Sequence, residues 1–127
     1  MPNGFHGTPD EWKRIAAPLE RLDSILGEFA VSRDLTLWKN SRNWPERSFR
    51  WGNAPERLIQ IFLEDQTTLS YTMWISASDD RSRAEYWMQE TLSKSVQIGI
   101  MERELPKLLA RAYEKLTEWA QEYDRAG

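Results

Sequence analysis

The chain has 127 residues, with 17 basic and 20 acidic side chains, a formal net charge of −3 and seven tryptophans. This length fits one domain, and such a domain buries about two-thirds of its unfolded surface without needing a disulfide. The chain has no cysteine, which excludes disulfides, thiolate nucleophiles and cysteine-ligated metal centres. We therefore predict a single domain over residues 1–127, with residues 1–7 as a loose N-terminus.

The sequence also bears on where the protein works. Its first ten residues contain Gly, Pro, Asn and His instead of the apolar stretch of a signal peptide. No run approaches the roughly 18 apolar residues of a membrane-spanning helix. The absence of cysteine suits a reducing compartment. We therefore predict a soluble cytoplasmic protein with no membrane partner.

The N-terminal segment predicts a helix. Thr8 can cap it, Pro9 suits its first position and Glu11 completes a capping box. Apolar side chains then recur at helical spacing along one stripe, which consists of Trp12, Ile15, Ala16, Leu19, Leu22 and Leu26. Pro18 removes a backbone donor inside this stripe, so we expect a kink or short break there. Gly27 predicts the end of the helix.

The middle of the chain shows the period-two alternation of β-strands. Apolar and polar residues alternate in four segments, 35–37, 49–51, 59–63 and 69–77. Turn-forming residues separate these segments, and such short connections suit antiparallel neighbours. Residues 84–92 fit a helix and a strand equally well. We assign a strand to them because a strand extends the meander.

The C-terminal segment predicts a second helix that begins at Pro106. Its apolar side chains form one stripe over about five turns, which consists of Leu105, Leu108, Leu109, Ala112, Leu116, Trp119, Ala120 and Tyr123. The opposite face carries Glu114, Lys115, Glu118 and Glu122, which is typical of a solvated surface. The sequence therefore predicts an α+β domain. It has an N-terminal helix, an antiparallel β-meander of four or five strands and a C-terminal helix, with both helices packed on one face of the sheet.

The chain lacks the motifs of phosphate loops, nucleophile elbows, dinucleotide-binding folds and zinc proteases. Its one imidazole, His6, lies in the predicted loose N-terminus, where a catalytic base or metal ligand is poorly held. The carboxylate pairs Glu64–Asp65 and Asp79–Asp80 fall in predicted turns, where such side chains commonly bond the local backbone. We predict no catalytic residue, no metal site and no cofactor. An enzyme without a recognisable motif ranks third among the functional hypotheses.

The two faces of the predicted strands differ in composition. Odd-numbered positions are the more apolar, and we expect them to face the helices. Even-numbered positions are mostly polar, as on a solvated sheet face, but they include Trp38, Phe62 and Trp74, together with Arg50. Each aromatic side chain can bury about 150–250 Å². If the three cluster, their surface is near or above the largest apolar patch that a monomer usually exposes.

Three interpretations of this aromatic face compete. In the first, a loop carrying Trp44, or residues 93–103, covers the face and completes a second small core. In the second, the face contacts a protein partner or a second copy of the chain. In the third, aromatic rings and Arg50 hold a small molecule or single-stranded nucleic acid by stacking.

The charge distribution weighs on the choice between partners. Residues 33–57 hold six basic and three acidic side chains, which is a modest imbalance in a chain of negative net charge, so nucleic acid is the disfavoured partner. We predict a binding or protein-interaction domain that self-associates as a homodimer. The predicted contact surface consists of Trp38, Arg50, Phe62 and Trp74. The alternative is a small-molecule or single-stranded nucleic-acid site made by the same four residues.

Overall fold

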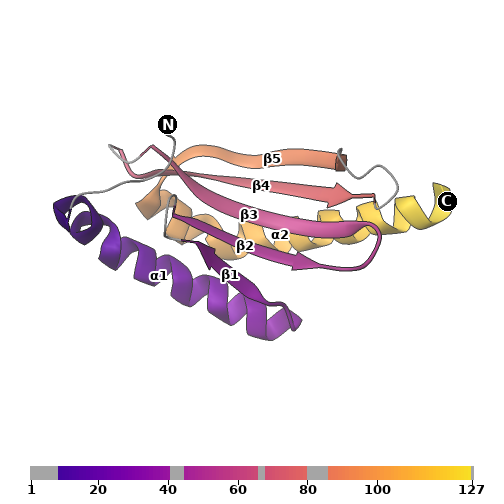
Figure 1. The fold of residues 1–127 in the computed structure, drawn as a ribbon, viewed down its shortest axis with the longest axis horizontal. Coiled ribbons are helices and arrows are strands. Elements are labelled where there is room, and N and C mark those ends of the chain that lie inside the picture. The colour runs from indigo at the N-terminus through magenta and orange to yellow at the C-terminus, as the bar shows by residue number, and fades with distance from the viewer. Residues whose placement is uncertain (1–8, 41–44, 66–67, 80–85, 127) are drawn as a thin grey trace.

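The computed structural model describes residues 9–40, 45–65, 68–79 and 86–126. They form two helices and five strands, with one helix before the first strand and the other after the last (Figure 1). The bounds are α1 Pro9–Arg33, β1 Leu37–Asn40, β2 Glu46–Trp51, β3 Glu56–Asp65, β4 Ser70–Ser78, β5 Tyr86–Gln97 and α2 Ile98–Ala126. The predicted α+β class is confirmed. His6 and the predicted loose terminus lie outside the described residues.

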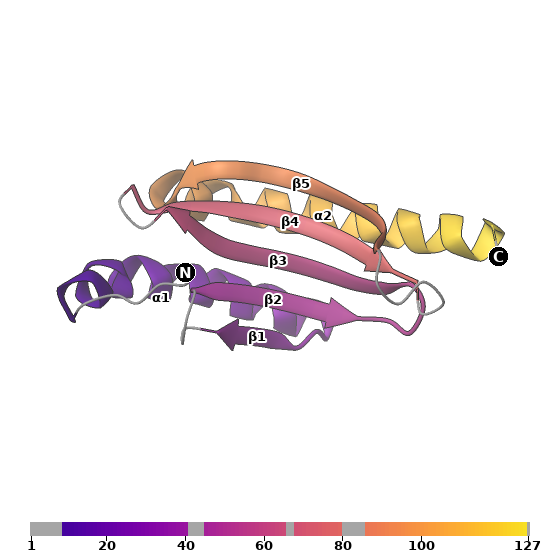
Figure 2. The same cartoon turned by 45° about the horizontal axis from the view of Figure 1, so that its top comes forward.

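The sheet is a meander in which each strand pairs with its neighbours in sequence. All four pairings are antiparallel, as predicted. Both helices lie on the same side of the sheet, with α1 near β1 and β2 and with α2 behind the other strands (Figures 1 and 2). This arrangement leaves the other face of the sheet without a helix.

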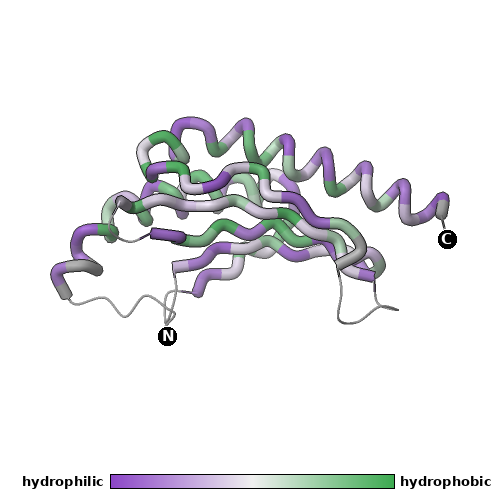
Figure 3. Tube along the Cα trace, turned by 90° about the horizontal axis from the view of Figure 1, so that it is seen from above, coloured by the Kyte–Doolittle hydropathy of each residue, from purple (hydrophilic) through white to green (hydrophobic). Residues whose placement is uncertain are grey.

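The hydrophobic core lies between the helices and the odd-numbered face of the sheet. The strand residues of this core all have odd numbers, namely Phe49, Ile59, Ile61, Leu63, Tyr71, Met73, Ile75 and Ala77. They pack in one cluster with one side of each helix, including Leu22 of α1 and Leu105 of α2. Figure 3 shows this sidedness in α2, where purple and green positions alternate along the helix. The prediction that odd-numbered strand residues face the helices is therefore confirmed.

α1 is longer than predicted. It continues through Pro18 without a break, and it passes Gly27, so the predicted end there is wrong. Buried side chains lie before and after each of these two residues, at Ile15, Leu19, Leu22, Leu26 and Ala30. Their packing against the core outweighs the local preferences of proline and glycine, because most helical stability in proteins comes from tertiary contacts.

The left-handed residue that ends α1 is Asp34, with a φ of 55°. The Leu35 N–H donates to the Ala30 carbonyl at 2.8 Å, and the Asp34 N–H donates to the Val31 carbonyl at 3.3 Å. These two bonds form a Schellman motif, which satisfies the last carbonyls of the helix. The end of α1 is therefore set by a cap at an aspartate and not by a glycine.

α2 begins directly after β5, about two turns ahead of Pro106. The predicted start at Pro106 is wrong, because Met101 and Leu105 are fully buried and hold the preceding turns against the sheet. The strand interpretation of residues 84–92 is confirmed over its described part, which belongs to β5. Residues 84–85 lie outside the described ranges.

A buried ion pair fastens α1 to the sheet. The Arg47 side chain lies on the helix side of β2, and Arg47 is 4% exposed. Its Nε donates to Asp23 Oδ1 at 2.5 Å, and its Nη2 donates to Asp23 Oδ2 at 3.1 Å. Its Nη1 donates to the Glu46 carbonyl at 3.0 Å. A more exposed pair, with Arg21 Nε 3.1 Å from Glu102 Oε2, joins α1 to α2.

The Tyr71 hydroxyl is buried and has no hydrogen-bond partner among the described residues. Burial raises the pKa of Tyr71 to about 12, with a further increase from Asp23 that the charge of Arg47 opposes. The phenol is therefore neutral at physiological pH. It belongs to the hydrophobic core between the sheet and the helices.

Candidate functional site

The face of the sheet turned away from the helices consists of the even-numbered residues of β1 to β4, from Trp38 to Ser78, and we call it the open face. Directly paired residues share a face in an antiparallel sheet. Gln89 and Thr91 of β5 therefore also belong to the open face, through their pairing with Ser76 and Trp74. Both helices lie against the other face of the sheet (Figures 1 and 2).

One interpretation placed a cover over this face. Residues 93–103 do not supply it, because they form the end of β5 and the start of α2, which packs on the other side of the sheet. That part of the prediction is wrong. The alternative cover, a loop carrying Trp44, lies outside the described residues.

The strand register places the four predicted site residues in two pairs instead of one cluster. One row of directly paired residues crosses the sheet, namely Trp38, Ser48, Gln60, Trp74 and Thr91. At about 4.8 Å per strand, the backbones of Trp38 and Trp74 lie about 14 Å apart in this row. Arg50 lies diagonal to Trp38, and Phe62 lies diagonal to Trp74, within reach of long side chains.

Among the aromatic side chains that the structure describes on the open face, that of Trp38 is the most exposed. It lies on the edge strand β1 and is 61% exposed. Phe62 and Trp74 are half-buried, and Arg50 is exposed. Leu58 is 8% exposed although it also lies on this face. The open face is therefore more accessible near β1 than over β3 and β4.

The charged residues of the open face lie at or near the ends of its strands and have partners there. Gln60 Nε2 donates to Glu46 Oε2 at 2.6 Å. Arg50 Nε lies 3.0 Å from Glu56 Oε1. The row that contains Trp38 is uncharged from one edge of the sheet to the other. Charge adjoins this row, because Arg50 lies diagonal to Trp38 and Glu46 pairs directly with Phe62. Aromatic residues accompanied by arginine are enriched in protein–protein interfaces.

A hydrogen-bonded cluster joins β3, β4 and β5. The Glu64 carboxylate accepts hydrogen bonds from the Thr72 hydroxyl and, at 2.7 Å, from the Ser95 hydroxyl. These bonds, that of Thr72 first, lower the pKa of Glu64 below its usual range. Ser95 has a φ of 54° in an irregular part of β5, and its N–H donates to Thr72 Oγ1 at 3.1 Å. Glu64 therefore braces this irregular part and is not poised as a general acid. Glu64 belongs to β3, so the prediction that it lies in a turn is wrong.

A hollow of about 460 Å³ lies beside Trp38 and Arg50, and its described lining also includes Thr36 and Ser48. This volume is typical of small-ligand sites. An indole and a guanidinium together suit a ligand with a flat ring and an acidic group. The sequence did not single out Thr36 or Ser48. The pairing of β1 with β2 places Ser48 directly opposite Trp38, which no local pattern indicates.

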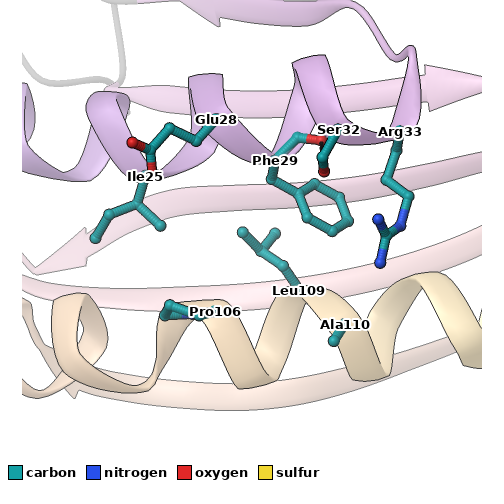
Figure 4. Close-up of a pocket in the computed structure, with 8 residues that line it drawn as sticks. All are labelled: Ile25, Glu28, Phe29, Ser32, Arg33, Pro106, Leu109 and Ala110. Carbon is teal, nitrogen blue, oxygen red and sulfur yellow. Dashed lines mark hydrogen bonds between the residues drawn. The ribbon is translucent and has the colours of Figure 1, made fainter.

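A second hollow, of about 300 Å³, lies on the helix side between α1 and α2 (Figure 4). Ile25 and Phe29 point from α1 toward Leu109 of α2. The Arg33 guanidinium lies 5.5 Å from the centre of the Phe29 ring and 5.3 Å from that of Tyr113. These cation–π contacts hold the end of α1 against α2. We interpret this hollow as part of the contact line between α1 and α2, which we call the seam.

Neither edge of the sheet is well suited to pairing with another sheet. β1 has four residues. β5 has twelve residues, but its pairing with β4 has three register shifts. Short and bulged edge strands resist the addition of a further strand. Neither edge therefore favours the addition of a strand from a second molecule.

Among the described residues, no three His, Cys, Asp or Glu side chains are grouped so that they could hold a metal ion. Within the same ranges, neither helix is long and apolar enough to cross a membrane. The chain matches no protein-family model, no curated protein and no solved structure.

Proposed function

We propose that this protein is a protein-interaction domain that self-associates through the open face to form a homodimer. The observation that supports the proposal most is the exposed indole of Trp38, which lies in an uncharged row on the face that neither helix covers. We also propose that the protein acts in the cytoplasm, which its cysteine-free sequence supports.

The energetics of burying Trp38 favour such pairing. Two sheets pack face to face at about 10 Å, a space that large side chains fill. Burying the exposed part of one Trp38 side chain removes roughly 100–150 Å² from water, which is worth about 3 kcal/mol. A two-fold axis makes both copies contribute this term. Phe62 and Trp74 add apolar surface on the same face.

Replacing Trp38 with alanine is expected to raise the dissociation constant of the homodimer at least about tenfold, because a truncated aromatic anchor costs more than about 1.4 kcal/mol of binding. Sedimentation velocity across a dilution series measures this change. The series is run at high salt, so that contacts between exposed charges are screened.

The matched control is Val31→Ala on α1, because Val31 is 85% exposed but lies away from the open face. This variant is expected to dimerise like the unmodified chain. A chain that stays monomeric at every concentration, or a dimer that Trp38→Ala leaves unchanged, contradicts the proposal.

The hollow beside Trp38 and Arg50 favours a second candidate function, the binding of a small ligand or a short single strand by stacking and charge. Adenosine monophosphate and a single-stranded oligothymidylate are suitable probes. Titration is expected to change the tryptophan fluorescence of the unmodified chain but not of Trp38→Leu. Arg50→Gln should weaken binding, and salt should weaken binding of the oligonucleotide steeply. A flat titration with both probes rejects this candidate.

A further inference from the structure

The outer side of α2 carries an ordered set of charges, which we call the charged stripe. It consists of Arg103, Lys107, Arg111, Glu114, Glu118 and Glu122. All six residues are exposed. None of them has an ion-pair partner within the part of the chain that the structure describes. The first three are basic and the last three are acidic, so the stripe has one positive half and one negative half.

The stripe faces away from the rest of the molecule. Its spacing of three and four residues keeps all six side chains within one sector of a helix with 3.6 residues per turn. The buried residues of α2, among them Met101, Leu105 and Ala112, lie on the other side. Nineteen steps of about 1.5 Å give the stripe a length of about 28 Å. The C-terminal end of α2 extends past the sheet (Figures 1 and 2), which leaves it accessible.

The order of charges does not serve the isolated helix. Along the stripe, Arg103, Lys107 and Arg111 follow one another at intervals of four residues, and so do the three glutamates. Like charges at this spacing repel each other on a helix surface. Alternating charges at the same positions would attract. Within the stripe only Arg111 and Glu114 are neighbours of opposite charge, three residues apart, so a partner of opposite charge would relieve the repulsion within each half.

A second copy of α2 is such a partner when it runs antiparallel. The stripe is symmetric about the midpoint between Ala112 and Tyr113. In an antiparallel pair centred there, Arg103 faces Glu122, Lys107 faces Glu118 and Arg111 faces Glu114 of the other copy. Every facing pair is of opposite charge. A parallel pair in register instead places each charge against its own kind.

We propose that two copies of this chain dock antiparallel through the charged stripe of α2. This goes beyond the proposed function, because the stripe lies on the helix side of the molecule and the open face on the other. A two-fold axis at the midpoint turns the three kinds of facing pair into six ion pairs. The small side chains of Pro106 and Ala110 adjoin the basic half, next to the seam in Figure 4, and leave room for close approach of a second helix.

The test uses two charge-reversal variants. One variant carries Glu114→Lys, Glu118→Lys and Glu122→Lys, so its stripe is wholly basic. The other carries Arg103→Glu, Lys107→Glu and Arg111→Glu, so its stripe is wholly acidic. Both also carry Trp38→Ala, which removes the contribution of the open face. Trp38→Ala alone is the reference, and native mass spectrometry and sedimentation at low salt report the species present.

The reference protein is expected to form a dimer whose dissociation constant rises at least about tenfold when salt shortens the screening length to a few ångströms. Each reversal variant alone should be monomeric. An equimolar mixture of the two should form a heterodimer, because their stripes are then complementary throughout.

A mixture that forms no heterodimer overturns the proposal, and so does a reversal variant that dimerises like the reference. Circular dichroism checks that both variants keep their helices. If a triple variant unfolds, Lys107→Glu and Glu118→Lys are mixed instead, since these two positions face each other in the proposed dimer. The salt series and the heterodimer do not depend on the open face, so they test the stripe separately from the proposed function.

Discussion

Replacing Asp23 with alanine is expected to lower the free energy of unfolding by about 3–5 kcal/mol. The Asp23 carboxylate takes two hydrogen bonds from the Arg47 guanidinium, and Arg47 is 4% exposed. Removing the carboxylate leaves a buried positive charge without its counter-charge, which is among the costliest single changes in a protein. Urea unfolding followed by circular dichroism measures the loss.

Two variants separate this cost from general effects of substitution. Arg21→Ala removes the ion pair with Glu102, in which the Arg21 side chain is 59% exposed, and should cost less than about 1 kcal/mol. The double variant Asp23→Leu with Arg47→Met removes both buried charges and should recover most of the stability. If Asp23→Ala costs no more than Arg21→Ala, the pair does not fasten α1 to the sheet as we describe.

The second large effect is expected for Phe49→Ala, with a loss of about 3–5 kcal/mol in the free energy of unfolding. Phe49 is fully buried on the helix side of β2, and its ring centre lies 5.5 Å from that of Phe29 in an edge-to-face contact. Truncation removes the apolar transfer energy and leaves a cavity between α1 and the sheet. Thermal and urea unfolding both report this loss.

Phe62→Ala is the matched control, because it deletes the same side chain from the other face of the same sheet. Phe62 is half-buried on the open face, so the loss of stability should be about 1 kcal/mol. Phe62→Ala should also weaken the proposed homodimer directly, because Phe62 lies on the open face. Phe49→Ala should affect the homodimer only by destabilising the fold. Equal losses of stability for the two variants would contradict the structure, in which Phe49 faces the helices and Phe62 lies on the open face.

Much of the fold follows from hydropathy alone, because each face of an element meets a different environment. The alternation at residues 59–63 and 69–77 predicted the strands and also the face that meets the helices. The ends of the helices were harder to predict. A cap at Asp34 depends on two backbone hydrogen bonds that tertiary packing fixes, and Gly27 has the local properties of a helix end without being one.

The candidate site was less accessible to prediction than the fold. The parity of the strands placed Trp38, Phe62 and Trp74 on one face, but their separation depends on how strands pair. Pairing puts Ser48 and Gln60 between the two tryptophans, and no local pattern encodes that. On β5 the register shifts also break the simple alternation, so an odd or even residue number does not show which face of the sheet a side chain of β5 lies on.

The meander has a consequence for how the chain reaches its native state. Since each strand pairs with its sequence neighbour, the sheet can grow hairpin by hairpin, with little entropy lost in closing loops. α1 is different, because Arg21 meets Glu102 across 81 positions of the chain. α1 therefore completes its contacts with a helix that is synthesised after all five strands, and a nascent chain that still lacks α2 exposes part of the hydrophobic face of its β-sheet.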